Sequence, residues 1–367
     1  MKYYVIAGEA SGDLHGANLL KALQKEDHTA EFRVWGGDKM MAAGGELVKH
    51  YKDLAFMGFV EVAKNIKTIL GNISFCKKDI LAFQPDVLIL IDYPGFNLRI
   101  AKWAKDNSIR VFYYISPQLW AWHESRVKQI RANVERMYVI IPFEEAFYKK
   151  HNIEVDFVGH PLKDVIEKYE GKPLKIKNKY KKIIALLPGS RKQELNRVLP
   201  KMLEAVKVFP NYHFVVAKAP TMDEAIYKNL IQLAQVDNIE IINDRTYDIL
   251  NLSHAALVTS GTATLETALF KIPQVVCYNG HPLSYQIAKR LVDVPYISLV
   301  NLIAEEEIVT ELIQGDLNKE NLVKALTKIL EGADRKQMID RYEILLGKLG
   351  KSGASKTAAR LMFDRLT

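Results

Sequence analysis

The fold of this chain is decided by the stretch His254-Ala-Ala-Leu-Val-Thr-Ser-Gly-Thr-Ala-Thr-Leu-Glu-Thr-Ala-Leu-Phe270. It opens as a short apolar run, turns at Ser260-Gly261 and continues with helical spacing through Leu265 and Leu269. A glycine at such a turn lets a ligand approach the backbone. The first turn of the helix then offers unpaired N–H groups and a positive dipole end to an anion. The stretch therefore predicts a strand, a tight turn and a helix start that suits a phosphate group.

The polar side chains at this helix start have two interpretations. Glu266 lies about one turn into the helix, where its carboxylate can reach a ribose diol. Alternatively, Thr262 caps the helix and Glu266 complements the helix dipole. Taken alone, the stretch favours the structural interpretation. The other segments of the chain shift the preference toward the ligand-binding interpretation.

The composition indicates a water-soluble protein of two domains. Its 367 residues exceed what one hydrophobic core usually serves, and 49% are hydrophobic and 26% charged. The formal net charge of +8 suits an anionic partner such as a phosphorylated substrate, a nucleic acid or an acidic membrane surface, although basic proteins can also simply be soluble. With two cysteines and no Cys/His cluster, neither a disulfide framework nor a structural zinc site is expected.

Neither a signal peptide nor a membrane-spanning helix is predicted. The first apolar run is short and is followed at once by Glu9 and Asp13. No run approaches the roughly 18 apolar residues of a spanning helix. We therefore expect a cytoplasmic protein whose contact with a membrane, where there is one, is peripheral.

Two successive series of strand–helix units predict an α/β protein with two domains. Strands are expected at 3–8, 31–37, 86–92, 110–116, 136–141 and 155–159, then at 183–187, 213–218, 239–242, 255–258, 274–278 and 297–300. Helical pattern dominates from Glu305 onward, and the lysine-rich stretch 171–182 reads as an exposed connection. We expect one α/β domain over 1–165, a second over 166–345 and a C-terminal helical segment over 346–367.

The second half carries two glycine turns between a strand and a helix, Gly189–Arg191 and Ser260–Thr262. Two such turns can hold a diphosphate from both sides, and Arg191 adds the planar cationic fork that suits phosphate oxygens. Because the chain has no Asp-x-Asp pair, a divalent metal is not required, and helix dipoles with Arg191 can carry the charge. This pattern predicts a transferase in which a nucleoside diphosphate leaves a sugar.

The first half offers a phosphate turn and a candidate base. Gly8–Gly16 matches neither the GxGxxG nor the Walker spacing, which disfavours a dehydrogenase. Alternatively, Ser11 and Asp13 cap the helix, and His15 is packed in the core. Asp92 ends a buried strand, where open α/β sheets place their chemistry, and is the best-placed general base for an acceptor hydroxyl; alternatively it caps the next helix. One carboxylate acting from one side implies displacement with inversion.

An apolar segment precedes a lysine-flanked helical pattern at 66–70. It contains Phe56, Met57, Phe59 and Val60. It suits either a core helix with a solvated lysine face or a patch that lies on a bilayer, and the residues alone leave both open. The lysines are scattered and no recognition motif occurs, so nucleic-acid binding is not expected.

Motifs from end to end of the chain resemble the lipid-A-disaccharide synthase family of glycosyltransferases, which have the GT-B fold. They are Gly8-Glu-Ala-Ser-Gly-Asp13, Ile91-Asp-x-Pro-x-Phe-Asn97, Ser116-Pro-x-x-Trp-Ala-Trp122, Pro142-Phe-Glu144, Val158-Gly-His160, Leu187-Pro-Gly-Ser-Arg191, Ser260-Gly-Thr-Ala-Thr-Leu-Glu266 and Asn301-Leu-Ile-Ala304. The first and third are the most specific, whereas Pro-Gly-Ser-Arg and Ser-Gly-Thr fit several nucleotide-sugar enzymes.

The resemblance implies two Rossmann-like parallel-sheet domains that face each other across a cleft. It implies transfer of 2,3-diacylglucosamine from UDP-2,3-diacylglucosamine to the 6-hydroxyl of 2,3-diacylglucosamine 1-phosphate, giving a β-1,6-linked disaccharide 1-phosphate and UDP without a cofactor. Since these substrates are acylated, it favours the bilayer interpretation of the apolar segment, on the cytoplasmic face of the inner membrane. It also allows a homodimer and a last helix that packs back on the first domain.

The resemblance also carries roles onto matching residues. Asp92 and Arg191 would be catalytic, and the acceptor side would hold Gly8, Ser11, Gly12, Asp13 and His15. The donor would be bound by Gly189, Ser190, Arg191, Ser260, Gly261, Thr262, Glu266, Asn301 and Gln314. Gly95 and Val300 depart from the family pattern, which often has Asp and Pro there, so the loop shape near Asp92 is less defined. The alternatives are another UDP-N-acetylglucosamine transferase or epimerase of the same fold, and a non-catalytic binding protein.

Overall fold

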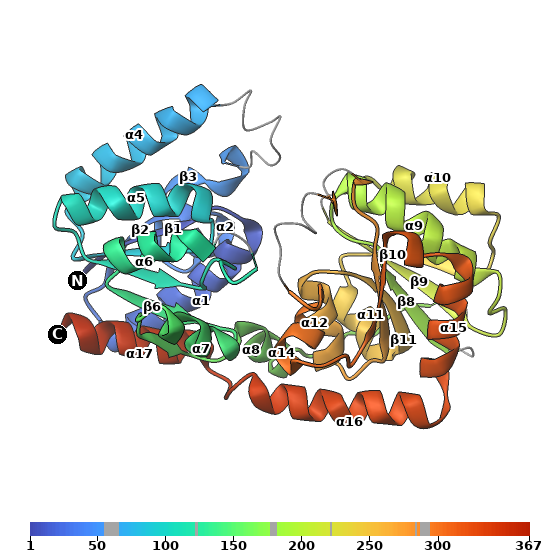
Figure 1. Ribbon diagram of the computed structural model, residues 1–367. Helices are drawn as coiled ribbons and strands as arrows, with labels where there is room; N and C mark the ends of the chain where they lie inside the picture. The colour runs from blue at the N-terminus through green and yellow to red at the C-terminus, as the bar shows by residue number, and fades with distance from the viewer. Residues whose placement is uncertain (55–65, 122–123, 177–181, 221, 283–284, 287–293) are drawn as a thin grey trace. The chain divides into compact units, whose positions relative to one another are not determined.

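The computed structural model describes residues 1–54, 66–121, 124–176, 182–220, 222–282, 285–286 and 294–367 (Figure 1). These residues divide into two compact units, one of Met1–Asp164 with Leu349–Thr367 and one of Val165–Lys348. The residues predicted to contact a membrane lie outside the described ranges, as does one tryptophan of the Trp-Ala-Trp motif: Phe56, Met57, Phe59, Val60 and Trp122.

The first unit is a parallel sheet with helices. Its strands are β1 (Lys2–Ala7), β2 (Glu31–Gly36), β3 (Glu46–His50), β4 (Val87–Ile91), β5 (Val111–Tyr114), β6 (Arg136–Val139) and β7 (Val155–Phe157). Its helices are α1 (Ala10–Glu26), α2 (Asp38–Ala42), η1 (Tyr51–Asp53), α4 (Ile66–Phe83), α5 (Pro94–Asp106), η2 (Glu124–Arg126), α6 (Val127–Asn133), α7 (Phe143–Lys150) and α17 (Ala354–Leu366); α8 (Pro161–Glu167) runs from this unit into the second.

The seven strands follow the order β3-β2-β1-β4-β5-β6-β7. All neighbours are parallel, and the register places Ala7 beside Ile91. Every residue of β4 is fully buried, as expected for an apolar, largely β-branched run covered on both faces. The strand order reverses between β1 and β4, so residues that follow these two strands meet at one edge of the sheet.

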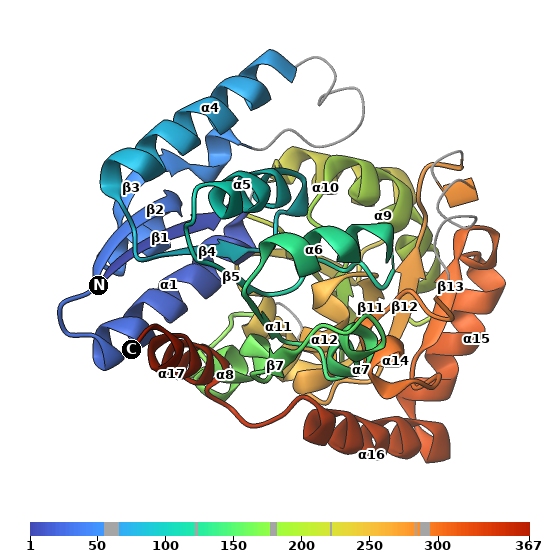
Figure 2. The ribbon, with the colours of Figure 1, turned by 60° about the vertical axis from the view of Figure 1, so that its left-hand side comes forward.

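Helices cover both faces of this sheet. One core cluster joins the sheet to α4, α5 and α6, with Cys76, Ile100 and Ile130 among its buried members. Helices α1 and α17 pack together on the opposite face, as Figures 1 and 2 show. The C-terminal segment Leu349–Thr367 belongs to this unit and is held by two hydrogen bonds. One runs from His160 N to Leu349 O (3.0 Å), and the other joins the hydroxyls of Tyr114 and Ser355 (3.3 Å).

The second unit repeats this architecture. Its strands are β8 (Ile183–Leu187), β9 (His213–Lys218), β10 (Ile239–Asn243), β11 (Ser253–Thr259), β12 (Gln274–Tyr278) and β13 (Thr310–Ile313). Its helices are α9 (Lys192–Val206), α10 (Glu224–Ala234), α11 (Thr246–Leu252), α12 (Thr262–Leu269), α14 (Leu299–Ala304), η3 (Gln314–Asp316), α15 (Lys319–Leu330) and α16 (Gly332–Lys348).

The six strands are again parallel, in the order β10-β9-β8-β11-β12-β13. The order reverses between β8 and β11, so the two glycine turns that follow these strands lie side by side. Two parallel sheets with helical connections confirm the predicted α/β class. The expected strand at 297–300 is wrong, because α14 begins at Leu299 behind Ser298, whose hydroxyl accepts a hydrogen bond from Asn301 N. Strands β3 and β13 were not expected.

Candidate functional site

A cavity of about 420 Å³ lies in the second unit where the strand order reverses. It brings together seven residues that the sequence assigned to a donor: Gly189, Ser190, Arg191, Ser260, Gly261, Thr262 and Glu266. The other lining residues are Leu187, Glu194, Ala217, Ala219, Pro220, Thr246, Thr259 and Ala263. The cavity is thus built from the carboxyl ends of β8, β9 and β11, the edge at which open α/β sheets bind ligands.

Both turns depend on glycine, each for a different reason. Gly189 has a φ of 101°, and an added Cβ would lie 2.7 Å from the Glu194 carboxylate. Gly261 has a φ of 151° and a ψ of −163°, a backbone region that is essentially closed to other residues. A Cβ at Gly261 would meet no described atom within 4 Å, so the backbone at this turn is open to a ligand.

Two helix N-termini adjoin the cavity. Helix α9 begins after Arg191 and α12 after Gly261, and neither start is capped by a side chain. Thr262 is therefore not the cap that the structural interpretation required. The Arg191 side chain is 63% exposed and pairs with Glu194 at 3.2 Å. Uncapped N–H groups, two positive dipole ends and one guanidinium together suit a diphosphate.

Two adjacent hydroxyls at the end of β11 differ in their availability. Ser260 donates to Ile297 O at 2.9 Å, so its hydroxyl proton is already used. Thr259, which also lines the cavity, has a buried hydroxyl without a hydrogen-bond partner among the described residues. Ser260 but not Thr259 is predictable from the sequence as a donor residue, because only the folded structure shows which hydroxyl is paired.

Glu266 lines the cavity from α12, with one carboxylate oxygen held from behind. Its Oε1 accepts a hydrogen bond from the Tyr247 hydroxyl at 2.7 Å. Burial raises the pKa of Glu266, and the hydrogen bond from Tyr247 opposes that rise. The carboxylate is therefore poised between a polar partner and the cavity rather than simply complementing the helix dipole.

Asn301 has no side-chain atom left for a nucleotide. It is fully buried, and its Nδ2 donates to Val309 O at 2.8 Å and to Glu311 Oε1 at 2.9 Å. Its Oδ1 accepts from the backbone N–H groups of Ile308 and Val309. The structure thus gives Asn301 the task of joining α14 to β13. Gln314, just after β13, donates weakly to Gly280 O at 3.5 Å and lies outside the cavity lining.

In the first unit, Asp92 follows β4 at the reversal of strand order, beside the start of α1. Asp92 and Tyr93 both have left-handed backbones, with φ values of 44° and 50°. The Asp92 carbonyl accepts from Asn97 Nδ2 at 2.7 Å and from the Tyr113 hydroxyl at 2.5 Å. Two consecutive left-handed residues are costly, so a neighbourhood that enforces them indicates a functional position.

The environment of Asp92 tunes its acidity. Burial, together with the nearby charge of Glu9, raises the pKa of the Asp92 carboxyl to about 6. A base with a pKa close to neutrality is still ionised at pH 7 and still accepts a proton readily. No described hydrogen bond of Asp92 caps α5 through its carboxylate, and the start of that helix has no side-chain cap.

Gly8 and Gly12, which the sequence assigned to an acceptor, make room for neighbouring side chains. A Cβ on Gly8 would lie 2.3 Å from the Tyr93 ring, so the absence of a side chain lets this ring pack against the backbone that follows β1. A Cβ on Gly12 would lie 3.0 Å from Ala7 Cβ, which shows how closely α1 packs on its strand. Ser11 is exposed at the start of the same helix.

Asp13 caps a different helix from the one expected. Its carboxylate accepts backbone N–H bonds from Gly37 (2.7 Å), Met40 (3.0 Å) and Lys39 (3.1 Å) at the start of α2. His15 lies two residues further along α1, and burial lowers its pKa to about 4 with help from Lys39. His15 is therefore neutral at pH 7 and offers an acceptor phosphate a hydrogen bond at most.

Replacing Asp13 with alanine is expected to lower the free energy of unfolding by about 1–3 kcal/mol, because two buried N–H groups and a partly buried one lose their acceptor. Urea denaturation measures this loss. Ser11→Ala, two residues away on the exposed side of α1, should leave the unfolding free energy almost unchanged. An Asp13→Ala protein as stable as the wild type would show that the cap is dispensable.

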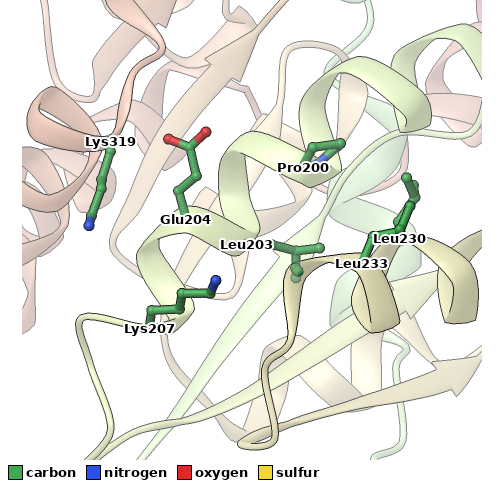
Figure 3. Close-up of a pocket in the computed structure, with 8 residues that line it drawn as sticks. Pro200, Leu203, Glu204, Lys207, Leu230, Leu233 and Lys319 are labelled. Carbon is green, nitrogen blue, oxygen red and sulfur yellow. The ribbon is translucent and has the colours of Figure 1, made fainter.

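A second cavity, of about 390 Å³, lies between the later turns of α9 and α10 (Figure 3). It is lined by Pro200, Leu203, Glu204, Lys207, Leu230, Leu233, Ala234 and Lys319. Pro200 lies eight residues after Lys192, so at 1.5 Å per residue the cavity begins about 12 Å along α9 from the glycine turn. Its lining is aliphatic apart from Glu204, Lys207 and Lys319 and has no glycine turn, and none of the predicted site residues contributes to it.

Two kinds of feature are absent from the described ranges, a metal-binding cluster and a membrane-spanning helix. No three His, Cys, Asp or Glu side chains gather there as a metal site would require. No helix among the described residues combines the length and hydropathy needed to cross a bilayer.

Comparison with known proteins gives close relatives over the whole chain. A family model described as lipid-A-disaccharide synthetase matches residues 3–361. The lipid-A-disaccharide synthase of Syntrophus aciditrophicus (strain SB) is 42% identical over 364 residues, which cover 97% of this chain and 95% of the relative. The one of Geobacter sulfurreducens (strain ATCC 51573 / DSM 12127 / PCA) is 35% identical over 371 residues, which cover 99% and 96%.

Solved structures share the fold at low sequence identity. The glycotransferase of kitacinnamycin has a TM-score of 0.69 at 14% identity and covers 100% of this chain and 99% of its own. The UDP-GlcNAc 2-epimerase from Neisseria meningitidis bound to UDP-GlcNAc has a TM-score of 0.62 at 16% identity, with coverage of 100% and 99%. These two establish the GT-B fold, while the family model and the relatives establish membership: the chain belongs to the lipid-A-disaccharide synthase family.

Proposed function

We propose that the protein transfers a 2,3-diacylglucosaminyl group from its UDP conjugate to the 6-hydroxyl of 2,3-diacylglucosamine 1-phosphate. The products are a β-1,6-linked tetraacyl disaccharide 1-phosphate and UDP. As a member of its family, the protein is a glycosyltransferase of lipid A disaccharide synthesis that uses a sugar nucleotide and a lipid A precursor.

The observation that carries the proposal is the cavity at the ends of β8 and β11. It combines two uncapped helix starts, the Arg191 guanidinium and the Glu266 carboxylate. A UDP-sugar needs complementary groups for its diphosphate and its ribose, and these are the chemical types present. Positive groups around the diphosphate would also stabilise the charge that develops as UDP leaves.

Asp92 supplies the second half of the proposed chemistry. Its carboxylate accepts the proton of the acceptor 6-hydroxyl while the oxygen attacks the anomeric carbon of the donor. The bond from that carbon to the UDP oxygen breaks in the same displacement, so an α-linked donor gives a β-linked product. UDP leaves with the electron pair of the broken bond, and its charge is met by Arg191 and the two helix starts.

The direct test is release of UDP from UDP-2,3-diacylglucosamine in detergent, with and without the monosaccharide 1-phosphate. Release that requires this acceptor and yields a β-linked disaccharide supports the proposal. Release that ignores the acceptor, or turnover of water-soluble UDP-N-acetylglucosamine instead, would favour another transferase or an epimerase of the same fold. Binding of UDP without any turnover would favour a non-catalytic protein.

The pH dependence of the reaction should report the ionisation of Asp92. Because the base must be deprotonated, kcat/KM is expected to fall about tenfold per unit below the pKa of about 6. In the Glu9→Gln variant the neighbouring charge is gone, so the pKa of Asp92 drops and this acid limb moves to lower pH. Initial rates between pH 4.5 and 8 in one mixed buffer measure the shift.

The matched control for this pH profile is Glu31→Gln. It removes the same charge from the start of β2, at the opposite edge of the same sheet. Its acid limb should coincide with that of the wild type. An acid limb that stays in place in Glu9→Gln would show that Glu9 does not act on the group that titrates.

We also propose that the first unit docks peripherally on an anionic membrane surface. Helix α4, which follows the predicted apolar segment, exposes Leu70, Phe75 and Leu81 by 58%, 48% and 52%. Exposed apolar side chains and a net charge of +8 suit such a surface.

The fraction of protein that sediments with anionic vesicles should fall in the double variant Leu70→Ser, Leu81→Ser. It should persist in Ile344→Ser, which removes an equally exposed side chain from α16.

A further inference from the structure

We infer that Tyr247 is a positioning residue that aims the Glu266 carboxylate at the ribose of the donor and so sets the preference for ribonucleotides. This inference rests on the proposed role of Glu266 in binding UDP. Tyr247 is not among the residues that line the cavity, whereas Glu266 and Thr246 are. Any effect of Tyr247 on the nucleotide must therefore pass through its neighbours, and its polar contact is with Glu266.

The Tyr247 hydroxyl fixes one end of the carboxylate. It donates to Glu266 Oε1 at 2.7 Å, a length typical of a good bond between a hydroxyl and a carboxylate. No other residue in the described part of the chain donates a hydrogen bond to the Glu266 carboxylate. With Oε1 held, Oε2 and the second lone pair of Oε1 can accept the two hydroxyl protons of a ribose diol.

The ring of Tyr247 is itself fixed by aromatic packing. Its centroid lies 5.9 Å from that of Tyr169, edge to face, and 5.4 Å from that of Phe270. The Tyr169 and Phe270 rings also meet at 5.4 Å. Such contacts favour one ring orientation. The hydroxyl is thus delivered to Glu266 from a rigid support, as the orientation of a ligand-binding group requires.

The hydrogen bond from Tyr247 also favours the ionised form of Glu266, the form that only accepts hydrogen bonds. Burial raises the pKa of Glu266, and the Tyr247 hydrogen bond is the one interaction that lowers it. If the carboxyl were protonated, one of its oxygens would donate a hydrogen bond, and it could no longer accept from both hydroxyls of a ribose diol. Removing the Tyr247 hydroxyl should therefore weaken ribose recognition twice, by freeing the side chain and by raising its pKa further.

The experiment compares UDP with 2′-deoxyuridine diphosphate on the full-length protein by titration calorimetry at pH 7.5. The wild type should bind UDP at least about tenfold more tightly, since hydrogen bonds to a charged group are among the stronger ones. Tyr247→Phe keeps the ring and its packing. We expect the ratio of the two dissociation constants to fall to about 2 or below, through weaker binding of UDP while the affinity for the deoxy compound changes little.

The matched control is Tyr169→Phe. It removes a hydroxyl from the same aromatic cluster, but that hydroxyl donates to Asp248 rather than to Glu266. It should leave the ratio at the wild-type value. Unchanged binding of the deoxy compound by Tyr247→Phe also verifies that this variant is folded.

Glu266→Gln separates failure of the inference from failure of the proposed function. If Glu266→Gln keeps the ribose preference, then Glu266 does not bind ribose and the proposed donor contact is wrong. If Glu266→Gln loses the preference while Tyr247→Phe keeps it, only the inference about Tyr247 is overturned. A second readout is the pH dependence of UDP binding, whose acid limb should move to higher pH in Tyr247→Phe and stay unmoved if Tyr247 only supports the fold.

Discussion

Replacing Asp92 with asparagine is expected to lower kcat about 10³-fold, because general base catalysis typically contributes 10²–10⁴-fold. The amide keeps the shape of the side chain and tolerates the left-handed backbone at this position. UDP should bind the variant within about twofold of the wild type, since Asp92 belongs to the first unit and does not line the cavity proposed to hold the donor. Steady-state assays of UDP release and a UDP titration measure the two effects separately.

Asp86→Asn provides the control for Asp92→Asn. It makes the same chemical change at the other end of the same strand, where the carboxylate accepts a hydrogen bond from Lys2 N at 2.7 Å. Its kcat should match that of the wild type. Full activity of Asp92→Asn would mean that another group takes the proton, and the displacement mechanism proposed above would need a different base.

Arg191→Ala is expected to have the second-largest effect, a fall in kcat/KM of about 10²–10³-fold, the size found when a transition-state charge donor is removed. UDP affinity should also fall, because the proposed contact of the guanidinium with the diphosphate would exist in both the ground state and the transition state. Arg191→Lys should recover only part of the loss, since an ammonium cannot form the bidentate contact. The ion pair with Glu194 is exposed, so the fold should lose little stability.

Lys192→Ala is the matched control for the arginine. It removes a neighbouring positive charge that is exposed but does not line the cavity. If Arg191 acted only through long-range attraction of the anionic substrate, the two variants would lose the same amount of activity. A large loss in Arg191→Ala together with a small loss in Lys192→Ala would therefore identify a direct contact.

The central strands could be predicted closely from sequence, and some of the edge strands could not. Strands β8, β9 and β12 coincide with the expected segments, because a strand buried on both faces is a continuous apolar run bounded by turn residues. The two strands that were not expected, β3 and β13, both lie at the edge of a sheet. Edge strands are covered less completely, so their sequences carry a weaker apolar signal.

The site was predictable where function depends on local sequence, and unpredictable where it depends on pairing across the chain. The glycine turns at Gly189 and Gly261 are read from a few consecutive residues. By contrast, the partners of Asp13 lie on α2, and those of Asn301 lie on and before β13. Tyr247 meets Glu266 only because α11 and α12 flank the same strand. No spacing rule in the sequence connects these residues.

The left-handed, partly buried Asp92 implies a trade-off between stability and activity. A carboxyl whose pKa rises from 3.8 to about 6 on folding destabilises the folded state by about 2–3 kcal/mol at neutral pH, at 1.36 kcal/mol per unit. That penalty is complete above pH 6 and vanishes below pH 4, where the carboxyl is protonated in both states. Asp92→Asn should thus melt at a higher temperature than the wild type at pH 7.5 and equally at pH 4. The folded state is thus less stable with the carboxylate than it would be with the amide, a cost expected at a catalytic position rather than at a structural one.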